Sequence, residues 1–222
     1  HYKLMGDYIG RISLAMSAGQ QINNTLVLQP TTSAWMYFSR KDKNLGIFKI
    51  GDGFKNLIYR MEQEHLEYDL GSEYVIKTLG SINGDKLTVG ERDYSLVVIP
   101  EEMENIDSPT LEMLEQYLEN GGNILSFNLN ISRVDGEESS EAQDLVARFP
   151  DNWTDTEQLE DPVALKMLRN DQFEMLDKTR NGMLYHQRRM LEDGQLLFMV
   201  NSHESEKAMA ETSVYGKYVI KL

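Results

Sequence analysis

The stretch from Ser95 to Phe127 reads SLVVIPEEMENIDSPTLEMLEQYLENGGNILSF and contains a complete strand, helix and strand pattern. Its first five residues, Ser95 to Ile99, form an apolar run closed by a proline, which is typical of a strand buried on both faces. Ser108 is the predicted cap of a helix, and Gly121 is the predicted left-handed residue that ends it. Asn123–Phe127 repeats the apolar strand pattern. Two such strands around one helix predict parallel pairing with a right-handed crossover.

The residues before this stretch show the same alternation. Thr25–Leu28 is another apolar run stopped by a proline, and we predict a second buried strand there. Helices are predicted over the first 19 residues, at about Gly53–Gln63 and at about Ser72–Leu79, with a short strand near Leu66–Asp69. The sequence therefore predicts an α/β fold: an open, flavodoxin-like parallel sheet with helices on both faces.

The chain is predicted to have three parts. Residues 1–150 form the flavodoxin-like domain, and 151–181 form an irregular helical connection, because 151–177 reads as helical. Residues 182–222 have a β pattern, in which Met183–Leu191 and Gln195–Asn201 flank the hairpin signal Asp193-Gly194 and Val214–Leu222 is a further strand. We expect this last part to begin a β domain, cut from a longer polypeptide, or to extend the sheet.

Composition excludes several functions. The net charge of −14 argues against a nucleic-acid partner, which requires clustered Lys and Arg. The chain contains no run of 18 apolar residues, so membrane insertion is not predicted. The absence of cysteine excludes thiolate nucleophiles and cysteine-based zinc and iron-sulfur centres. His65, His186 and His203 share no metal-ligand spacing, and we predict no metal site and no cofactor.

The candidate site lies where the predicted strands end, because open α/β sheets bind ligands beyond the carboxyl ends of their strands. The segment Thr31–Tyr37, predicted as a loop, follows the first strand and is rich in polar and aromatic side chains. The candidate residues are Thr31, Ser33, Trp35, Tyr37, Glu101 and Asn128. Aromatic rings beside carboxylates and amides suit a sugar site, whereas aromatic side chains equally suit a contact with a neighbouring domain. Both interpretations remain open at this point.

No catalytic residue is predicted. Glycoside hydrolysis normally uses two carboxylates on opposite sides of one bond, and the only suggestive pairs lie among Glu62, Glu64, Glu67 and Asp69 or within 101–104. A chain this acidic produces such neighbours by chance, and most of them belong to solvated faces. Neither a nucleophile elbow nor a glycine-rich phosphate loop follows any predicted strand.

Several blocks carry a resemblance to a known family. They are HYKLMGDYIGRISLAMSAGQ (1–20), TLVLQPTTSAWMY (25–37), LEYDLGSEYVI (66–76), LTVGERDYSLVVIPEEMENIDSPTLEMLEQYLENGGNIL (87–125) and YHQRRMLEDGQLLFMVN (185–201). In this order they resemble the segment that follows the catalytic barrel in large bacterial α-L-rhamnosidase-like glycoside hydrolases. They also resemble the glutamine-amidotransferase-like domain of some β-galactosidases. The resemblance runs from Tyr2 to Leu222.

The resemblance implies a fold similar to class I glutamine amidotransferases without their cysteine nucleophile. It implies a noncatalytic structural or interface module, whose partners are the barrel and β-sandwich domains of a parent glycoside hydrolase acting on plant or host polysaccharides. It also implies a periplasmic or secreted location. A homo-oligomer and a carbohydrate are further candidate partners. The alternative is a carbohydrate- or small-ligand-binding module that uses the crevice at the strand ends.

Overall fold

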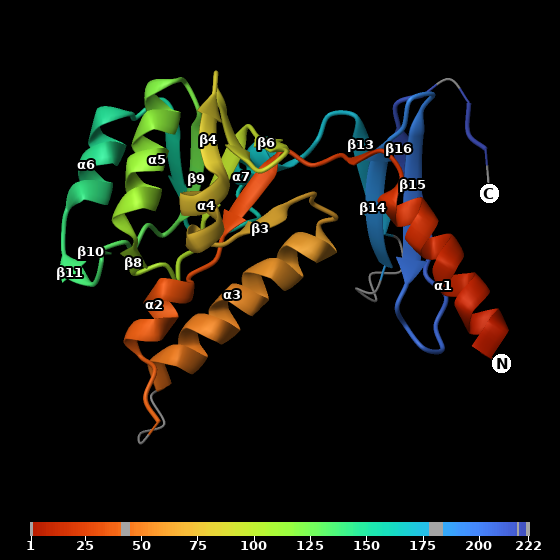
Figure 1. The fold of residues 1–222 in the computed structure, drawn as a ribbon, viewed down its shortest axis with the longest axis horizontal. Coiled ribbons are helices and arrows are strands. Elements are labelled where there is room, and N and C mark those ends of the chain that lie inside the picture. The colour runs from red at the N-terminus through yellow and green to blue at the C-terminus, as the bar shows by residue number, and fades with distance from the viewer. Residues whose placement is uncertain (1, 41–44, 178–183, 217, 221–222) are drawn as a thin grey trace. The chain divides into compact units, whose positions relative to one another are not determined.

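The computed structural model describes residues 2–40, 45–177, 184–216 and 218–220, and its elements form two compact units (Figure 1). The parallel-sheet unit comprises Asn24–Met61 and Tyr68–Leu168. The antiparallel unit comprises His1–Asn23, Glu62–Glu67 and Arg169–Leu222. Each unit therefore combines segments that are far apart in the sequence.

The first unit is built on a five-stranded sheet in which every neighbouring pair is parallel. Its strands are β2 (Thr25–Leu28), β3 (Asp69–Gly71), β7 (Leu96–Ile99), β9 (Asn123–Phe127) and β12 (Trp153–Thr156), arranged in the order β12-β9-β7-β2-β3. Leu26 of the central strand β2 lies opposite Asp69 on one side and Val97 on the other. The predicted α/β class is confirmed, and β2 and β9 have the bounds that the apolar runs predict.

Helices cover both faces of this sheet. They are α2 (Thr31–Met36), α3 (Leu45–Gln63), α4 (Glu73–Leu79), α5 (Ser108–Glu119), α6 (Glu141–Arg148) and α7 (Pro162–Leu168). One core cluster joins Leu26, Leu28 and Val97 to apolar side chains of α4, α5 and α6. Val27 and Val98, which alternate with these residues, point to the opposite face and are equally buried. The buried residues of α3 and α7 are not part of that cluster, and they belong to the core on the opposite face of the sheet.

Two small sheets complete this unit. One is formed by the antiparallel strands β4 (Gly80–Asn83), β5 (Lys86–Val89) and β6 (Arg92–Tyr94). The hairpin that Asn83-Gly84 suggests is present, but it turns at Gly84 and Asp85, because Asn83 pairs with Lys86. Strands β8 (Asn105–Ile106), β10 (Arg133–Val134) and β11 (Glu137–Glu138) form the other. Helix α5 packs on both β4 and β9 (Figure 1).

The second unit is antiparallel. It contains α1 (Tyr2–Ser17) and the strands β1 (Gln20–Gln21), β13 (Phe173–Asp177), β14 (Leu184–Met190), β15 (Gln195–Asn201) and β16 (Ala210–Val214). These strands form one sheet of order β1-β14-β15 and the pair β13-β16. The hairpin predicted around Asp193-Gly194 is confirmed, because Met190 lies opposite Gln195.

Five predictions about elements were wrong. The cap of α5 is Asp107 rather than Ser108, and the strand expected near Leu66–Asp69 is β3, which begins at Asp69. Thr31–Met36 is a short helix rather than a loop, and a buried hydrogen bond of Ser33 holds it in place. The segment 151–177 is not simply helical: it contains β12, α7 and β13, and the pairing of β12 with β9 overrides its mixed local pattern. The last strand, β16, ends at Val214 instead of beginning there, and the described residues beyond it are not in a strand. Gly182 and Met183, where the β region was predicted to start, lie outside the described residues.

Candidate functional site at the strand ends

The strand order defines where a ligand site would lie in the parallel sheet. The chain enters at β2 and adds β3 on one side, and then it crosses to add β7 on the other side. The segments that leave β2 and β7 therefore diverge, and ligands of open α/β sheets bind at such a point. Helix α2 follows β2, and residues 100–107 follow β7. These two segments line the candidate site.

Ser33 of α2 fills the space between these segments. Its Oγ accepts hydrogen bonds from the backbone N–H groups of Glu104 at 3.0 Å and Asn105 at 2.9 Å. The same hydroxyl donates to the carbonyl oxygen of Asn105 at 3.2 Å. Ser33 is completely buried, with no exposed surface. The backbone polar groups that a ligand would use at this point are thus bound to the protein itself.

A buried carboxyl group extends the same network. Glu73, in the first turn of α4, is only 4% exposed. Its Oε1 accepts the hydroxyl of Thr32 at 2.6 Å, and its Oε2 accepts the backbone N–H of Asp107 at 2.7 Å. Burial raises the pKa of Glu73, and the hydrogen bonds from Thr32 and Asp107 offset this only in part. Glu73 therefore connects α2, α4 and the segment after β7.

Two of the predicted site residues pair with acidic side chains nearer the surface. The phenol of Tyr37 donates to Glu104 Oε2 at 2.5 Å, and this hydrogen bond, with burial, raises the pKa of Tyr37. Asn128, which has a positive φ of 45°, donates through Nδ2 to the carbonyl of Glu157 at 3.0 Å and to Glu101 Oε2 at 3.4 Å. The structure therefore brings Ser33 and Tyr37 together at one loop, and Glu101 and Asn128 together at another.

Thr31 and Trp35 are placed differently. Both are exposed, and Trp35 has 69% of its surface accessible. Other large apolar side chains of α2, of the residues after it and of the start of α3 are also exposed. We call the set the α2–α3 surface, and its members are Trp35, Phe38, Leu45 and Phe48. The two helices meet here, because a Cβ on Gly46 would lie 2.4 Å from the ring of Tyr37.

The electrostatics of the strand ends are acidic. Burial raises the pKa of Glu102, and the neighbouring Glu101 raises it further. Burial, followed by the charge of Asp135, raises the pKa of Asp107. Negative charge at this edge disfavours phosphate or other anionic ligands. Within the described ranges, no three His, Asp or Glu side chains gather in a way that would hold a metal ion.

Ser33 and Tyr37, and Thr32 of the same predicted segment, lie in this network. Glu73 and Asn105, which complete it, were not predicted. The available signal was position, because Glu73 follows β3 by two residues and Asn105 lies in the segment after β7. The carboxylates of Glu73, Glu101 and Glu104 each accept a hydrogen bond from another residue of the protein. In the part of the chain that the structure describes, no helix has the length and apolar character needed to cross a bilayer.

Comparisons with known proteins give a likeness of fold. Neither the protein-family models nor the curated proteins give a match. Among solved structures, the chain is similar to a rhamnosidase from Novosphingobium sp. PP1Y, with a TM-score of 0.58, 13% identity and 93% of this chain covered. It is also similar to the apo exo-carrageenase GH42 from Bacteroides ovatus, with a TM-score of 0.56, 12% identity and 86% covered. The chain spans 19% of the rhamnosidase and 24% of the carrageenase, so each likeness concerns one segment of a much longer protein.

Proposed function

We propose that this chain is a noncatalytic structural and interface domain of a multidomain, α-L-rhamnosidase-like glycoside hydrolase. The observation that carries the proposal is the filled point between β2 and β7, where Ser33, Glu73 and Thr32 satisfy the polar groups that a substrate would need. Polar groups that are already hydrogen-bonded within the protein are not free to orient a sugar ring.

The fold supports the same proposal. Numbered along the chain, the five parallel strands lie in the order 2-1-3-4-5, which is the order of flavodoxin-like sheets. We infer that the parallel-sheet unit is flavodoxin-like, and the resemblance to class I glutamine amidotransferases is consistent with this order. The two solved structures named above carry the names of glycoside hydrolases, and each matches this chain over a segment of its length.

The α2–α3 surface is the face that we assign to domain contact. Its four large apolar side chains are between 60% and 80% exposed. Aromatic side chains are enriched in the cores of interfaces, and a cluster of them on a soluble surface indicates a binding site. The proposed partner of this surface is the catalytic barrel of the parent chain. The proposed location, secreted or periplasmic, rests on the family resemblance alone.

A pair of substitutions tests this assignment. Trp35→Ala with Phe48→Ala should leave the unfolding free energy of the 222-residue chain unchanged to within about 0.5 kcal/mol, because both side chains are exposed. In the complete parent polypeptide, the same pair should lower the temperature at which hydrolase activity is lost. Tyr59→Ala, an exposed aromatic residue farther along α3, is the matched control. An unchanged inactivation temperature in the parent would remove this surface from the interface.

Turnover tests the noncatalytic part directly. The purified chain should not hydrolyse aryl rhamnosides or aryl galactosides. Steady turnover that disappears on changing one of the chain's own carboxylates, such as Glu101→Gln, would show that the chain is an enzyme.

A further inference from the structure

The antiparallel unit has an unusual interior. Among its described residues, the buried apolar side chains are Leu66, Phe173 and Met175, whereas the parallel-sheet unit buries many more. Arg188 of β14, one of the largest fully buried side chains among the described residues, lies in this unit. A unit with so little apolar core depends on the polar contacts that surround its buried charge.

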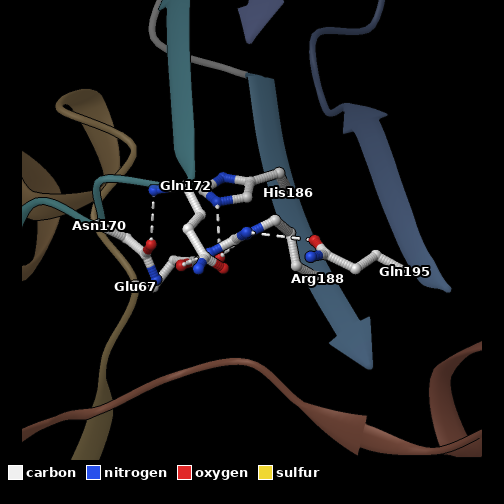
Figure 2. A network of polar contacts seen from close by, with 6 residues as sticks. All are labelled: Glu67, Asn170, Gln172, His186, Arg188 and Gln195. Atoms are coloured by element: carbon white, nitrogen blue, oxygen red, sulfur yellow. Dashed lines mark hydrogen bonds and ion pairs between the residues drawn. The ribbon is translucent and has the colours of Figure 1, made fainter. Parts of the chain in front are cut away.

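Arg188 is held by one carboxylate (Figure 2). Its Nε and Nη2 donate to Glu67 Oε1 at 2.7 Å and to Glu67 Oε2 at 2.6 Å, which is a bidentate pair. The side chain of Arg188 has no exposed surface, and that of Glu67 is 10% exposed. The guanidinium also lies 4.6 Å from the centre of the Phe173 ring. Glu67 therefore supplies the charge that compensates a completely buried cation.

Two imidazoles surround this ion pair. His186 Nε2 lies 3.6 Å from Glu67 Oε1, and its ring stacks on Phe173 at 4.5 Å. His65, from the same segment as Glu67, meets His186 edge to face at 6.1 Å. From β15, the uncharged Gln195 faces the pair, with its Oε1 3.4 Å from Arg188 Nη1. The titratable groups described beside the pair, His65 and His186, are both basic side chains.

We propose that Glu67, His186 and Arg188 form an acid-sensitive lock, which opens the antiparallel unit at low pH while the parallel-sheet unit stays folded. Protonation of Glu67 leaves the buried guanidinium of Arg188 without its counter-charge. Removing one partner of a buried ion pair is strongly destabilising, because the other charge remains buried. The segment Glu62–Glu67 is then released from β14.

The direction of the pH effect follows from proton linkage. Burial raises the pKa of Glu67, but the hydrogen bonds and charges of Arg188 and His186 outweigh it, and the pKa is lowered from 4.5. A carboxyl group with a lowered native pKa contributes stability above its ordinary pKa and loses it as the pH falls through the native value. The antiparallel unit should therefore weaken below about pH 4.5.

Three carboxyl groups of the parallel-sheet unit respond with the opposite sign, whereas the exposed Asp135, whose pKa is lowered by hydrogen bonds from Ser108, responds with the same sign as Glu67. Burial raises the pKa values of Glu73, Glu102 and Asp107, so their protonation favours the native state. Mild acid thus relieves buried charge in one unit and creates it in the other. This difference is the reason to expect separate opening.

Hydrogen exchange of the 222-residue chain between pH 7 and pH 3, corrected for the intrinsic pH dependence of exchange, tests the lock. Protection of the β14 and β15 amides should fall about tenfold for each unit by which the native pKa of Glu67 lies below 4.5. Amides of β7 and β9 should keep their protection. The fluorescence of Trp35 and Trp153, the two tryptophans, which both lie in the parallel-sheet unit, should report no transition over the same range.

Variants separate the lock from general acid sensitivity. Glu67→Gln should lower the protection of β14 and β15 already at pH 7, with the Trp153 signal unchanged. Glu64→Gln, in the same segment but in an ion pair with the half-exposed Arg169, should behave as the wild-type chain. The double variant Glu67→Gln with Arg188→Met carries neither buried charge and should show no acid response. Protection in the wild-type chain that is independent of pH, or that is lost from both units together, would overturn the proposal, as would an acid response in the double variant.

Discussion

At the scale of single residues, Ser33 is the position on which the candidate site depends most. Its hydroxyl serves two backbone donors and one backbone acceptor in a fully buried setting. Ser33→Ala leaves these groups unsatisfied, which typically costs about 1–3 kcal/mol for each buried group. We expect the unfolding free energy of the chain, measured in urea, to fall by about 2–3 kcal/mol.

The matched control is Ser140→Ala. Ser140 is exposed and its hydroxyl contacts Asp144 at 3.4 Å, so the change should stay within about 0.5 kcal/mol. Equal effects of the two substitutions would mean that the hydrogen bonds of Ser33 do not hold the two segments together.

Glu73 gives the second prediction at this scale. Because its pKa is raised, its contribution is fully favourable below the ordinary value of 4.5 and is lost as the pH rises through the native pKa. Glu73→Gln can keep the acceptor for the Asp107 N–H and turn the Thr32 contact around, without a charge to bury. Urea unfolding followed by Trp153 fluorescence at pH 4, 5.5 and 7 should show a flatter pH dependence than in the wild-type chain. A steeper dependence in the variant would contradict the assigned direction.

At the scale of elements, the end of α5 shows how local sequence specifies structure. Gly121 has a φ of +86° with open space around its Cβ position, whereas a Cβ on Gly122 would lie 2.2 Å from the buried ring of Tyr117. Asn tolerates the left-handed region, so Gly121→Asn should cost less than about 1 kcal/mol. Gly122→Ala forces the ring to move and should cost about 1–3 kcal/mol. Urea unfolding of both variants checks this order, and a reversed order would mean that conformation rather than space limits this turn.

The same scale shows what could be predicted and why. Strands β2 and β9 are apolar runs bounded by clear breaks, so their bounds were predictable from composition alone. Helix α2 was not, because Thr31, Thr32 and Ser33 are weak helix formers, and their conformation is fixed by contacts with Glu73 and Asn105. Strand β12 was missed for a different reason: Trp and Thr favour strands, but the four residues WTDT contain no aliphatic run, and their pairing with β9 is visible only in the structure.

At the scale of the whole molecule, the polar networks are long-range and invisible to a local pattern. Glu67 and Arg188 are 121 positions apart, and Ser33 and Asn105 are 72 positions apart. Periodicity predicts that a residue lies on a strand or helix, but it does not predict which charge it meets. The site could be located from the rule on strand ends, whereas its closure by the protein's own side chains required the structure.

The most direct measurement of the central claim, that the strand-end site is filled and the chain acts as an interface module, is calorimetric titration of the 222-residue chain with rhamnose, galactose and galacturonic-acid oligomers. We predict no saturable heat for any of them, because Ser33 and Glu73 occupy the positions where a sugar would bind. Saturable binding that is lost in Trp35→Ala would contradict the account and would make the chain a carbohydrate-binding module.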